Sequence, residues 1–280
     1  MREIQTATII ETVKELCIDA NCNLRCDTVQ AFKKAEKKEP SPLGREVLKQ
    51  LIRNSEISTA EQLPFCQDTG YAVLFIDIGQ DVKITGGSLT EALNEGVRQG
   101  HCKGFLRMSI LDNPLSRKNT GDNTPASIHY NIVSGDEFKI ALLVKGCGCD
   151  NVSALQMFKP SEGWEAAKKF IVQTVENAGP NASPPMTLGI GLGGPFAHAA
   201  YLAQKSLLWS LDKPNPDPQL RKLEAELVES INCLGIGPAG FGGETTCLGV
   251  HIEMGPAHIA AFPVAVNIDC HSHRGKEATL

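Results

Sequence analysis

Hydrophobic residues recur at helical spacing through the first sixty or so positions of the chain. Ile9, Val13 and Leu16 lie three or four residues apart, and the same spacing returns over residues 47–52 after a Ser-Pro start signal. The stretch AFKKAEKKEP between them (31–40) is dense in charge, which is typical of a solvated helix face and a helix end. The pattern therefore predicts a helical N-terminal portion over about residues 1–62.

From about residue 65 the pattern changes to that of strands. Apolar runs rich in Val, Ile and Gly predict strands at 71–82, 127–133, 139–146, 186–194 and 260–270. The stretches between them predict helices at 89–102, 161–179, 196–209 and 218–235. No internal repeat is visible. The alternation indicates an α/β to α+β fold, a helical N-terminal region followed by a mixed β-sheet layered with helices, in a single domain over residues 1–280.

Composition narrows the functional classes. In the 280 residues, 42% are hydrophobic, which is enough for a sizeable core. The 32 acidic and 27 basic residues give a net charge of −5, which offers no basic field for a nucleic acid. No apolar run reaches the ~18 residues of a membrane-spanning helix, so we expect a cytoplasmic protein without membrane contact. Ten cysteines are too few for a disulfide scaffold, which leaves burial, nucleophilic reactivity or metal binding.

Glycine-rich loops with polar or sulfur side chains lie where predicted elements begin or end. They are PFCQDTG (64–70), RKNTGDNT (117–124), KGCGCDN (145–151), GFGGETTCLGV (240–250) and PVAVNIDCHSHR (263–274). Binding and catalytic residues concentrate on such loops, because a rigid scaffold positions polar groups that a core cannot hold. We therefore expect the functional site to be built from these segments.

Taken singly, these motifs leave alternatives open. Cys66 is either a buried thiol or a site residue, and the Cys-x-Cys pair of KGCGCDN lacks the second ligand pair of a zinc site. The histidines that follow Cys270 are either ligands or solvent-facing residues. GIGLGG departs from the GxGxxG spacing, which excludes a dinucleotide fingerprint. The cations Lys145, Arg107 and Arg117 flank these loops and suit a small polyanion such as a dicarboxylate.

Together the motifs resemble a known family. PFCQDTG, RKNTGDNTPA, the Lys-Gly-x-Gly loop, PNASPP before GIGLGG, GIGPAGFGGETTCLGVH and PVAVNIDCHSHR follow one another as in the class I iron–sulfur hydro-lyases. Over nearly all 280 residues the chain is similar to the α subunit of two-subunit fumarate hydratases and L(+)-tartrate dehydratases. The resemblance implies reversible hydration of fumarate to malate, with L(+)-tartrate dehydration as the alternative.

The resemblance also implies a [4Fe-4S] cluster held by three cysteines, with one iron open as a Lewis acid. Cys66 and Cys270 match two of the ligand positions, but the third is Ser183 in this chain. A serine oxygen is a harder ligand than a thiolate. Three explanations remain: a serine-bound or weakly held cluster, replacement by another thiol, or a cluster-free, non-catalytic subunit. Cys149 is a candidate replacement, because the family usually has serine at that position.

The remaining site roles are implied by the same motif matches. Asp68 and His258 match catalytic positions; the substrate-binding positions are Gln67, Arg107, Lys145, Gly146 and Gly148. The resemblance further implies a separate β subunit that completes the active site and supplies the group removing the C–H proton. We therefore expect an α2β2 assembly acting on a small dicarboxylate.

Overall fold

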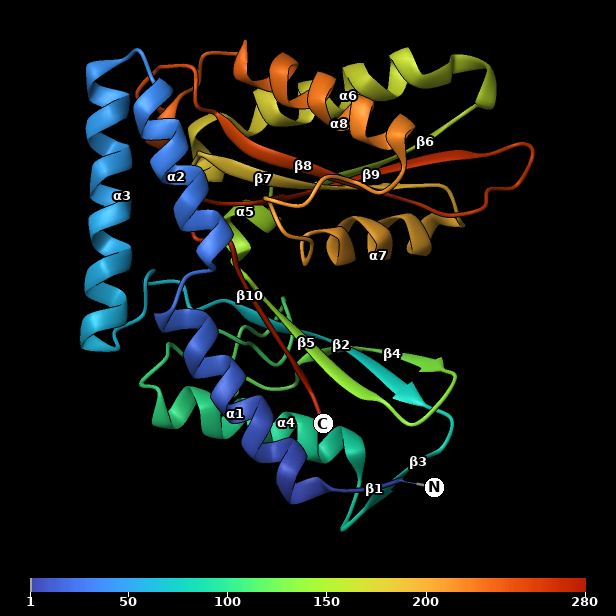
Figure 1. Cartoon of the computed structure of the whole chain (residues 1–280). Helices are drawn as coiled ribbons and strands as arrows, with labels where there is room; N and C mark the ends of the chain where they lie inside the picture. Colours follow the sequence, from blue (N-terminus) through green and yellow to red (C-terminus); the bar gives the residue numbers. More distant parts are fainter. Residues whose placement is uncertain (1) are drawn as a thin grey trace. The chain divides into compact units, whose positions relative to one another are not determined.

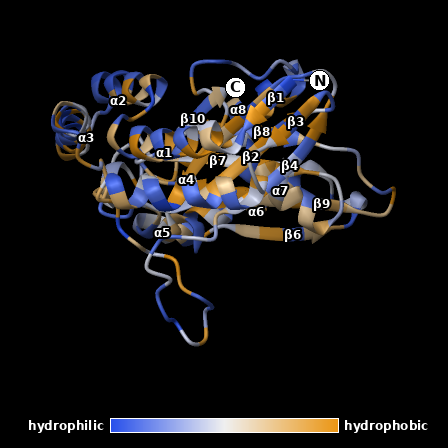
Figure 2. Cartoon of the chain, turned by 90° about the horizontal axis from the view of Figure 1, so that it is seen from below, coloured by the Kyte–Doolittle hydropathy of each residue, from blue (hydrophilic) through white to orange (hydrophobic). Residues whose placement is uncertain are grey.

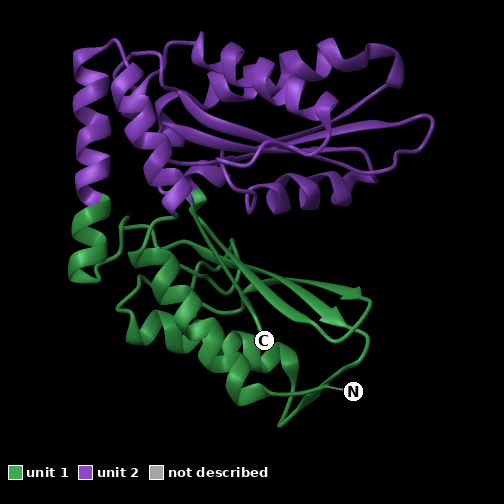
Figure 3. Ribbon diagram, viewed as in Figure 1, with its two compact units in different colours: residues 1–25, 55–147, 274–280 green, residues 26–54, 148–273 purple. Residues whose placement is uncertain are grey.

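The computed structural model describes residues 2–280, which form two compact units (Figure 3). Unit 1 contains the chain up to Arg25 together with Ser55–Cys147 and Arg274–Leu280, and unit 2 contains Cys26–Asn54 and Gly148–His273. Each unit is therefore assembled from segments that are far apart in the sequence. Among the described residues, no helix is both long and apolar enough to cross a membrane.

Unit 1 is built on a four-stranded mixed sheet. Its strands, in spatial order, are β10 (Arg274–Thr279), β5 (Phe138–Lys145), β2 (Tyr71–Gly79) and β4 (Ser127–Val133). The central strand β2 pairs antiparallel with β5 and parallel with β4, and β10 pairs antiparallel with the outer side of β5. A separate parallel pair joins β1 (Arg2–Gln5) to β3 (Val82–Thr85).

Two helices, α1 (Thr6–Cys22) and α4 (Leu89–Lys103), pack together in unit 1 and cover its sheet (Figure 1). Their close approach depends on glycine, because a Cβ built on Gly96 would lie 2.6 Å from the Cβ of Val13. The apolar positions of α1 point into the core with the strand residues, as the helical spacing of the sequence predicts. Ile9, Val13, Leu74 and Leu142 are each fully buried there.

Unit 2 is built on a second four-stranded mixed sheet. Its strands, in spatial order, are β6 (Ala154–Phe158), β9 (Phe262–Asp269), β7 (Met186–Leu192) and β8 (Cys247–Met254). Figure 1 shows α7 (Phe196–Ser206) on one face of this sheet and α6 (Gly163–Ala178) and α8 (Pro218–Asn232) on the other. Hydropathy follows this layering: β6 and β8 are coloured largely hydrophobic in Figure 2, whereas helices carry both colours.

The glycines of GIGLGG serve packing in unit 2. A Cβ on Gly189 would lie 2.0 Å from the carbonyl oxygen of Ala203, and one on Gly191 would lie 1.9 Å from that of Ala199. Both carbonyls belong to α7, so the two glycines let this helix approach the backbone of β7 directly. The structure thus explains the glycines of this motif by helix packing and not by nucleotide binding.

The two sheets arrange their strands in the same way in space, although the fourth strand comes last in the chain in unit 1 (β10) and first in unit 2 (β6). In each, a central strand has a parallel neighbour reached through a helical crossover and an antiparallel neighbour that follows next in the chain. In each, a fourth strand pairs antiparallel with the outer side of that antiparallel neighbour. A repeat that the sequence does not reveal is therefore present at the level of strand order.

The fold class expected from the sequence is confirmed: helices α1, α2 (Cys26–Lys38) and α3 (Pro42–Glu61) precede mixed sheets layered with helices. The charged stretch 31–40 contains one exception to the expected solvated face. Glu39, directly after α2, is completely buried, and its carboxylate accepts backbone N–H groups from Glu244 and Thr245 in unit 2.

Candidate active site

Asp68 joins two of the motif loops in unit 1. The loop 64–70 leads into β2, and the Asp68 carboxylate accepts the N–H of Gly70 at 3.0 Å through Oδ1. Its Oδ2 accepts the N–H of Cys147, in the KGCGCDN loop, at 3.1 Å. The preceding Cys66 is half-buried, and its thiol donates to the Oε1 of exposed Gln67 at 3.3 Å. Two loops separated by some eighty residues thus meet at a single carboxylate.

A buried guanidinium fixes the backbone beneath Asp68. Arg274 is 1% exposed; its Nη2 donates to the Asp68 carbonyl at 2.8 Å and its Nη1 to Asn21 Oδ1 at 2.8 Å. Asn21 in turn accepts the N–H of Phe65 through its own carbonyl at 2.9 Å. Charge-assisted hydrogen bonds of this kind hold geometry strongly, so the loop that carries Cys66 and Asp68 is anchored at both ends.

Asn123 connects the same loop to the segment that carries Arg107. It is fully buried, its Oδ1 accepts the Ser109 N–H at 2.7 Å, and its Nδ2 donates to the Gly70 carbonyl at 3.2 Å. Its Nδ2 also lies 2.8 Å from Nε2 of His101, whose pKa is lowered by burial. Neutral His101 accepts this hydrogen bond. The Arg107 side chain is exposed, while its carbonyl accepts the Thr69 hydroxyl at 3.2 Å.

Lys145 and the two glycines beside it lie at the end of β5. Lys145 is 1% exposed and donates to the carbonyl of Gly146 at 3.5 Å. A Cβ at Gly148 would meet no atom of residues 2–280 within 4 Å, so the backbone there borders open space. A glycine in this setting leaves room for a ligand to approach the main chain closely.

Cys149 and Cys270 lie together in unit 2 with an unpredicted carboxylate, Asp269. Their ligand atoms, two sulfurs and one oxygen, all lie within 4.8 Å of one another, and the Cys149 thiol donates to Asp269 Oδ1 at 3.6 Å. The second oxygen of Asp269 accepts a hydrogen bond from Nδ1 of His273 at 2.7 Å, and the buried Nε2 of His273 has no hydrogen-bond partner among the described residues. His273 is 0% exposed, which corrects the solvent-facing alternative for this residue.

Ser183 is tied to the Cys270 segment through its backbone. Its carbonyl accepts both the N–H of His271 at 3.1 Å and Nδ1 of the same histidine at 3.0 Å. Ser183 adopts the left-handed conformation, with φ 52° and ψ 63°, which is uncommon for a residue other than glycine. Residues in such strained conformations cluster at functional sites, and this one is half-buried at a motif position.

His258 lies on the exposed loop between β8 and β9. Its Nδ1 accepts the N–H of Ala260 at 3.2 Å, and its carbonyl accepts the N–H of Ala261 at 2.9 Å. These contacts hold the imidazole in a local turn. Unit 1 therefore contains Cys66, Gln67 and Asp68 together with Lys145 and Gly146. Unit 2 contains Gly148, Cys149, Ser183 and Cys270, with His258 on a separate loop.

A comparison with protein-family models shows the family to which the chain belongs. A model described as fumarate hydratase (Fumerase) matches residues 10–279 of the 280. The chain belongs to this fumarate hydratase family. Its members are hydro-lyases, and the chain is an enzyme of that class. The thiols gathered at Cys149 and Cys270 fit the iron–sulfur chemistry of the family, because thiolates are the ligands that hold such clusters.

Individual relatives in the family carry a different substrate name. The chain is 38% identical over 272 residues to a provisionally named L(+)-tartrate dehydratase subunit alpha of Methanocaldococcus jannaschii, covering 95% of each chain. It is 32% identical over 251 residues to the L(+)-tartrate dehydratase subunit alpha of Escherichia coli strains UTI89 and K12, covering 89% of this chain and 82% of theirs.

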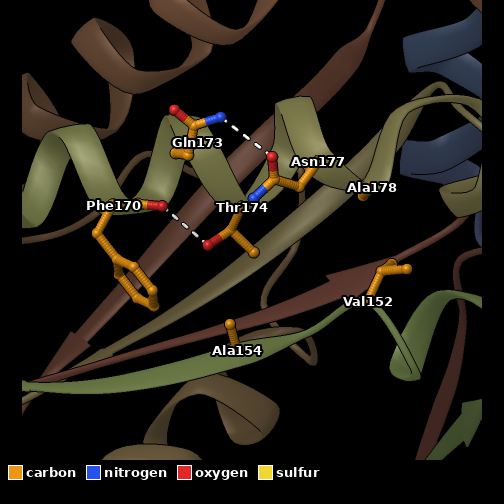
Figure 4. A pocket seen from close by; sticks show the side chains of 7 residues that line it. All are labelled: Val152, Ala154, Phe170, Gln173, Thr174, Asn177 and Ala178. Atoms are coloured by element: carbon orange, nitrogen blue, oxygen red, sulfur yellow. Dashed lines mark hydrogen bonds between the residues drawn. The ribbon is translucent and has the colours of Figure 1, made fainter.

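An apolar pocket elsewhere in unit 2 is unsuited to the substrates of this family. It has a volume of about 250 Å³ and lies beside α6, with Val152, Ala154 and Phe170 on its walls (Figure 4). Thr174, also in the wall, donates its hydroxyl to the Phe170 carbonyl of its own helix at 2.8 Å. None of the seven labelled side chains is charged, so the pocket offers nothing to pair with a carboxylate.

Sequence reasoning missed the residues that support the site. Asn21, Asn123, Asp269 and Arg274 make the buried hydrogen bonds described above, yet each is an ordinary polar residue in the sequence. Asp269 and Arg274 lie within the quoted motif PVAVNIDCHSHR, so their position beside Cys270 was the available signal. Asn21 lies in a helix without any motif and gave none.

Proposed function

We propose that the chain is the α subunit of a [4Fe-4S]-dependent hydratase that reversibly adds water to fumarate to give malate. The observation that carries the proposal is the family match over residues 10–279, together with buried thiols gathered at the motif positions. Cys66 and Cys270 are the proposed ligands common to the family, and the third is argued in the next subsection. When bound, the cluster supplies a Lewis-acidic iron that polarises the hydroxyl and a carboxylate of the substrate.

Asp68 is the proposed acid–base group on this chain. A carboxylate at this position can give or take the proton of the departing or attacking hydroxyl. The N–H groups of Gly70 and Cys147 fix its orientation, and Arg274 fixes its backbone, so little reorganisation accompanies the proton transfer. We propose that His258 is a second catalytic residue. We also propose that a base on the partner subunit removes the C–H proton of malate.

The substrate carboxylates need cations and backbone donors. The exposed guanidinium of Arg107 can bind one carboxylate in a bidentate manner, while its backbone is held by Thr69. Gln67 adds an amide next to Cys66, and Gly148 leaves space for backbone N–H groups to approach the ligand. Lys145 and Gly146 complete this glycine loop. These groups suit a small, doubly charged substrate.

A partner chain is part of the proposal, because the relatives are named as alpha subunits. We propose a separate β subunit that completes the active site, in an α2β2 assembly. We also place the enzyme in the cytoplasm, because a reducing compartment preserves thiolate ligands and an open iron.

L(+)-tartrate dehydration is the second candidate reaction, because the relatives reported above are named for it. Tartrate differs from malate by one hydroxyl, and the contacts named above recognise the carboxylates that both molecules share. The two reactions therefore use the same proposed residues of this chain.

Anaerobic co-expression with a candidate β subunit tests the proposal. We expect brown protein with iron and acid-labile sulfide, and measurable hydration of fumarate; L(+)-tartrate is assayed in parallel. Activity on L(+)-tartrate alone would replace the first candidate by the second. A colourless complex that takes up no iron on reconstitution and acts on neither substrate would identify a cluster-free subunit and contradict the proposal.

A further inference from the structure

We propose that Cys149, and not Ser183, supplies the third cysteine ligand of the cluster in this chain, an inference that rests on the proposed function. The family resemblance places cysteine at position 183 and serine at position 149. This chain has the reverse at both positions. This reciprocal exchange keeps one thiol and one hydroxyl in the two loops. It is expected if the third ligand thiol is now supplied from position 149 in place of position 183.

The structure places the relocated thiol beside the ligand that the family shares. The sulfur of Cys149 lies within 4.8 Å of that of Cys270, and the two residues are 4% and 9% exposed. Ligands must be deprotonated to bind iron, and soft thiolates are the donors that iron–sulfur clusters select. Two thiols this close lie within reach of a single inorganic group.

Hydrogen bonds hold the Cys149 loop against the end of β9. The Nδ2 of Asn267 donates to Asp150 Oδ1 at 2.8 Å and to Ser153 Oγ at 3.1 Å. The N–H of Ile268 also donates to Ser153 Oγ at 3.0 Å. Asp150 and Ser153 directly follow Cys149, and Asn267 and Ile268 precede Cys270, so these bonds fasten the segment after one thiol to the segment before the other. Preorganisation of this kind is what a ligand set requires.

Position 183 is attached to the same segment, which explains why the exchange is structurally feasible. The Ser183 carbonyl accepts two hydrogen bonds from His271, the residue directly after Cys270. A ligand at 183 and a ligand at 149 therefore both belong to loops that are fastened around Cys270. Of the two side chains present, the thiol of Cys149 is the better donor for iron, because an alkoxide is harder and far more basic.

The competing explanation is that Cys149 is a small buried hydrophobe, since it does border the core of unit 2. Its polar environment argues against that reading: the thiol donates to the buried carboxylate of Asp269 at 3.6 Å. Cys147, two residues earlier, is exposed and provides a matched control thiol in the same loop.

The test compares cluster content in the anaerobically reconstituted α–β complex. Four forms are purified by gel filtration: the unaltered chain, Cys149→Ser, Cys147→Ser, and the double variant Cys149→Ser with Ser183→Cys. Iron, acid-labile sulfide, the visible spectrum and the electron paramagnetic resonance of the reduced protein are measured, and circular dichroism checks the fold. We expect Cys149→Ser to lose cluster by about tenfold or more, since even outer-shell changes weaken metal binding 10–100-fold.

Cys147→Ser is expected to match the unaltered chain, and the double variant to regain the cluster with the thiol at the family position. Equal iron, sulfide and spectra in Cys149→Ser and the unaltered chain would overturn the inference. Loss in Cys149→Ser without recovery in the double variant would also overturn it, because the loss would then be structural. If the unaltered chain itself takes up no iron, the proposed function fails, an outcome distinct from either of these.

Discussion

At the scale of single residues, the candidate site depends on side chains that hold other side chains. Asp68 is oriented by two backbone N–H groups, its carbonyl is held by Arg274, and Asn123 holds the next loop in register. The bond between the Arg274 side chain and the Asp68 carbonyl involves a buried guanidinium, so salt screens it less than it screens a surface pair. A substitution of Asp68 itself and a substitution of a residue that positions it, such as Arg274, should therefore have different effects.

Replacing Asp68 by Asn keeps the size of the side chain and removes its ability to exchange a proton. We expect hydratase activity to fall by roughly 10²–10⁴-fold, the usual contribution of a positioned general acid or base. The iron and sulfide content should stay unchanged, because Asp68 is not among the proposed ligands of the cluster. Steady-state rates with iron analysis test this; a variant that retains full activity would remove Asp68 from the mechanism.

Glu39 is a residue whose loss should affect stability alone. Its carboxylate accepts the N–H groups of Ser41 at 3.1 Å, Glu244 at 3.1 Å and Thr245 at 2.7 Å. Burial opposes the charge, but these bonds and the Thr245 hydroxyl hold the pKa of Glu39 below its usual value. Alanine at 39 leaves buried donors unpaired, which costs about 3 kcal/mol and lowers the Tm by about 10 °C.

The control for Glu39→Ala is Glu46→Ala on α3. The Glu46 side chain is 56% exposed, and it forms a long surface ion pair with Lys49, whose Nζ lies 3.9 Å from Glu46 Oε2. Exposed pairs of this kind contribute little to stability, so the Tm should stay within about 2 °C. Equal thermal shifts in both variants would show that the buried carboxylate does not hold the loop at 244–245.

At the scale of elements, the sequence predicted those strands that consist almost entirely of buried apolar residues. The apolar runs of β2, β5 and β7 were predicted because each is buried along nearly its whole length. The strands β6, β8 and β10 were missed, and all three are edge strands. β10, for example, reads RGKEAT, and only its pairing with distant β5 makes it a strand. Such long-range pairing leaves no local signal.

The candidate site was predictable to a similar extent. The ordered motifs indicated Cys66, Asp68 and Cys270 as the proposed site residues, because the chemistry of such a site restricts the residue types it can use. The burial of Asp269 and Arg274 depends on contacts that form only in the folded chain, and sequence patterns do not record them. A prediction from sequence thus finds reacting groups more readily than the groups that position them.

Close approach of α7 to β7 gives a prediction for Gly191. A Cβ at this position would lie 1.9 Å from the Ala199 carbonyl oxygen, so the helix must move away from the sheet. We expect Gly191→Ala to reduce the free energy of unfolding by about 3 kcal/mol or more, measured by urea denaturation. Gly148→Ala is the control for stability, because its Cβ would meet open space. Equal unfolding midpoints would contradict this account of the motif.

Asp122, which precedes Asn123 in the same loop, gives a prediction for the stability of the protein at low pH. Burial alone would raise the pKa of Asp122, but hydrogen bonds from Arg98 and Thr124 lower it to about 2. Because the folded pKa lies below the unfolded value of about 3.9, the stabilisation is complete above that pH and is lost as the pH falls toward 2. After allowance for solvent screening it is on the order of 1 kcal/mol. Asp122→Asn should flatten the decline in stability between pH 4 and 2.

At the scale of the whole molecule, the two units differ in how their sheets are assembled from the sequence. All four strands of the unit 2 sheet lie between residues 154 and 269. The unit 1 sheet takes three strands from residues 71–145 and its fourth, β10, from residues 274–279. Arg274, at the start of β10, also binds Asn21 and Asp68. The closing segment of the chain is therefore structural and supports the site as well.

Replacing Arg274 by Met tests this dependence. The substitution removes two hydrogen bonds of 2.8 Å from a buried guanidinium and leaves their acceptors unpaired. We expect faster hydrogen exchange in β5, β10 and the loop at 64–70, with β7 and β9 unchanged. Lys276→Ala, which removes only a partly exposed pair with Asp19, should leave exchange nearly unaltered. Uniform loss of protection in both units would show that Arg274 has no local role.

The late position of β10 has a consequence for biosynthesis. As the nascent chain leaves the ribosome, the edge of β5 that later pairs with β10 emerges with unpaired N–H and C=O groups, and it stays so while more than a hundred further residues are translated. The sheet made from residues 154–269 has all its strands before that edge is covered. The later-translated sheet thus completes first, and until then the earlier one is vulnerable to mispairing and aggregation.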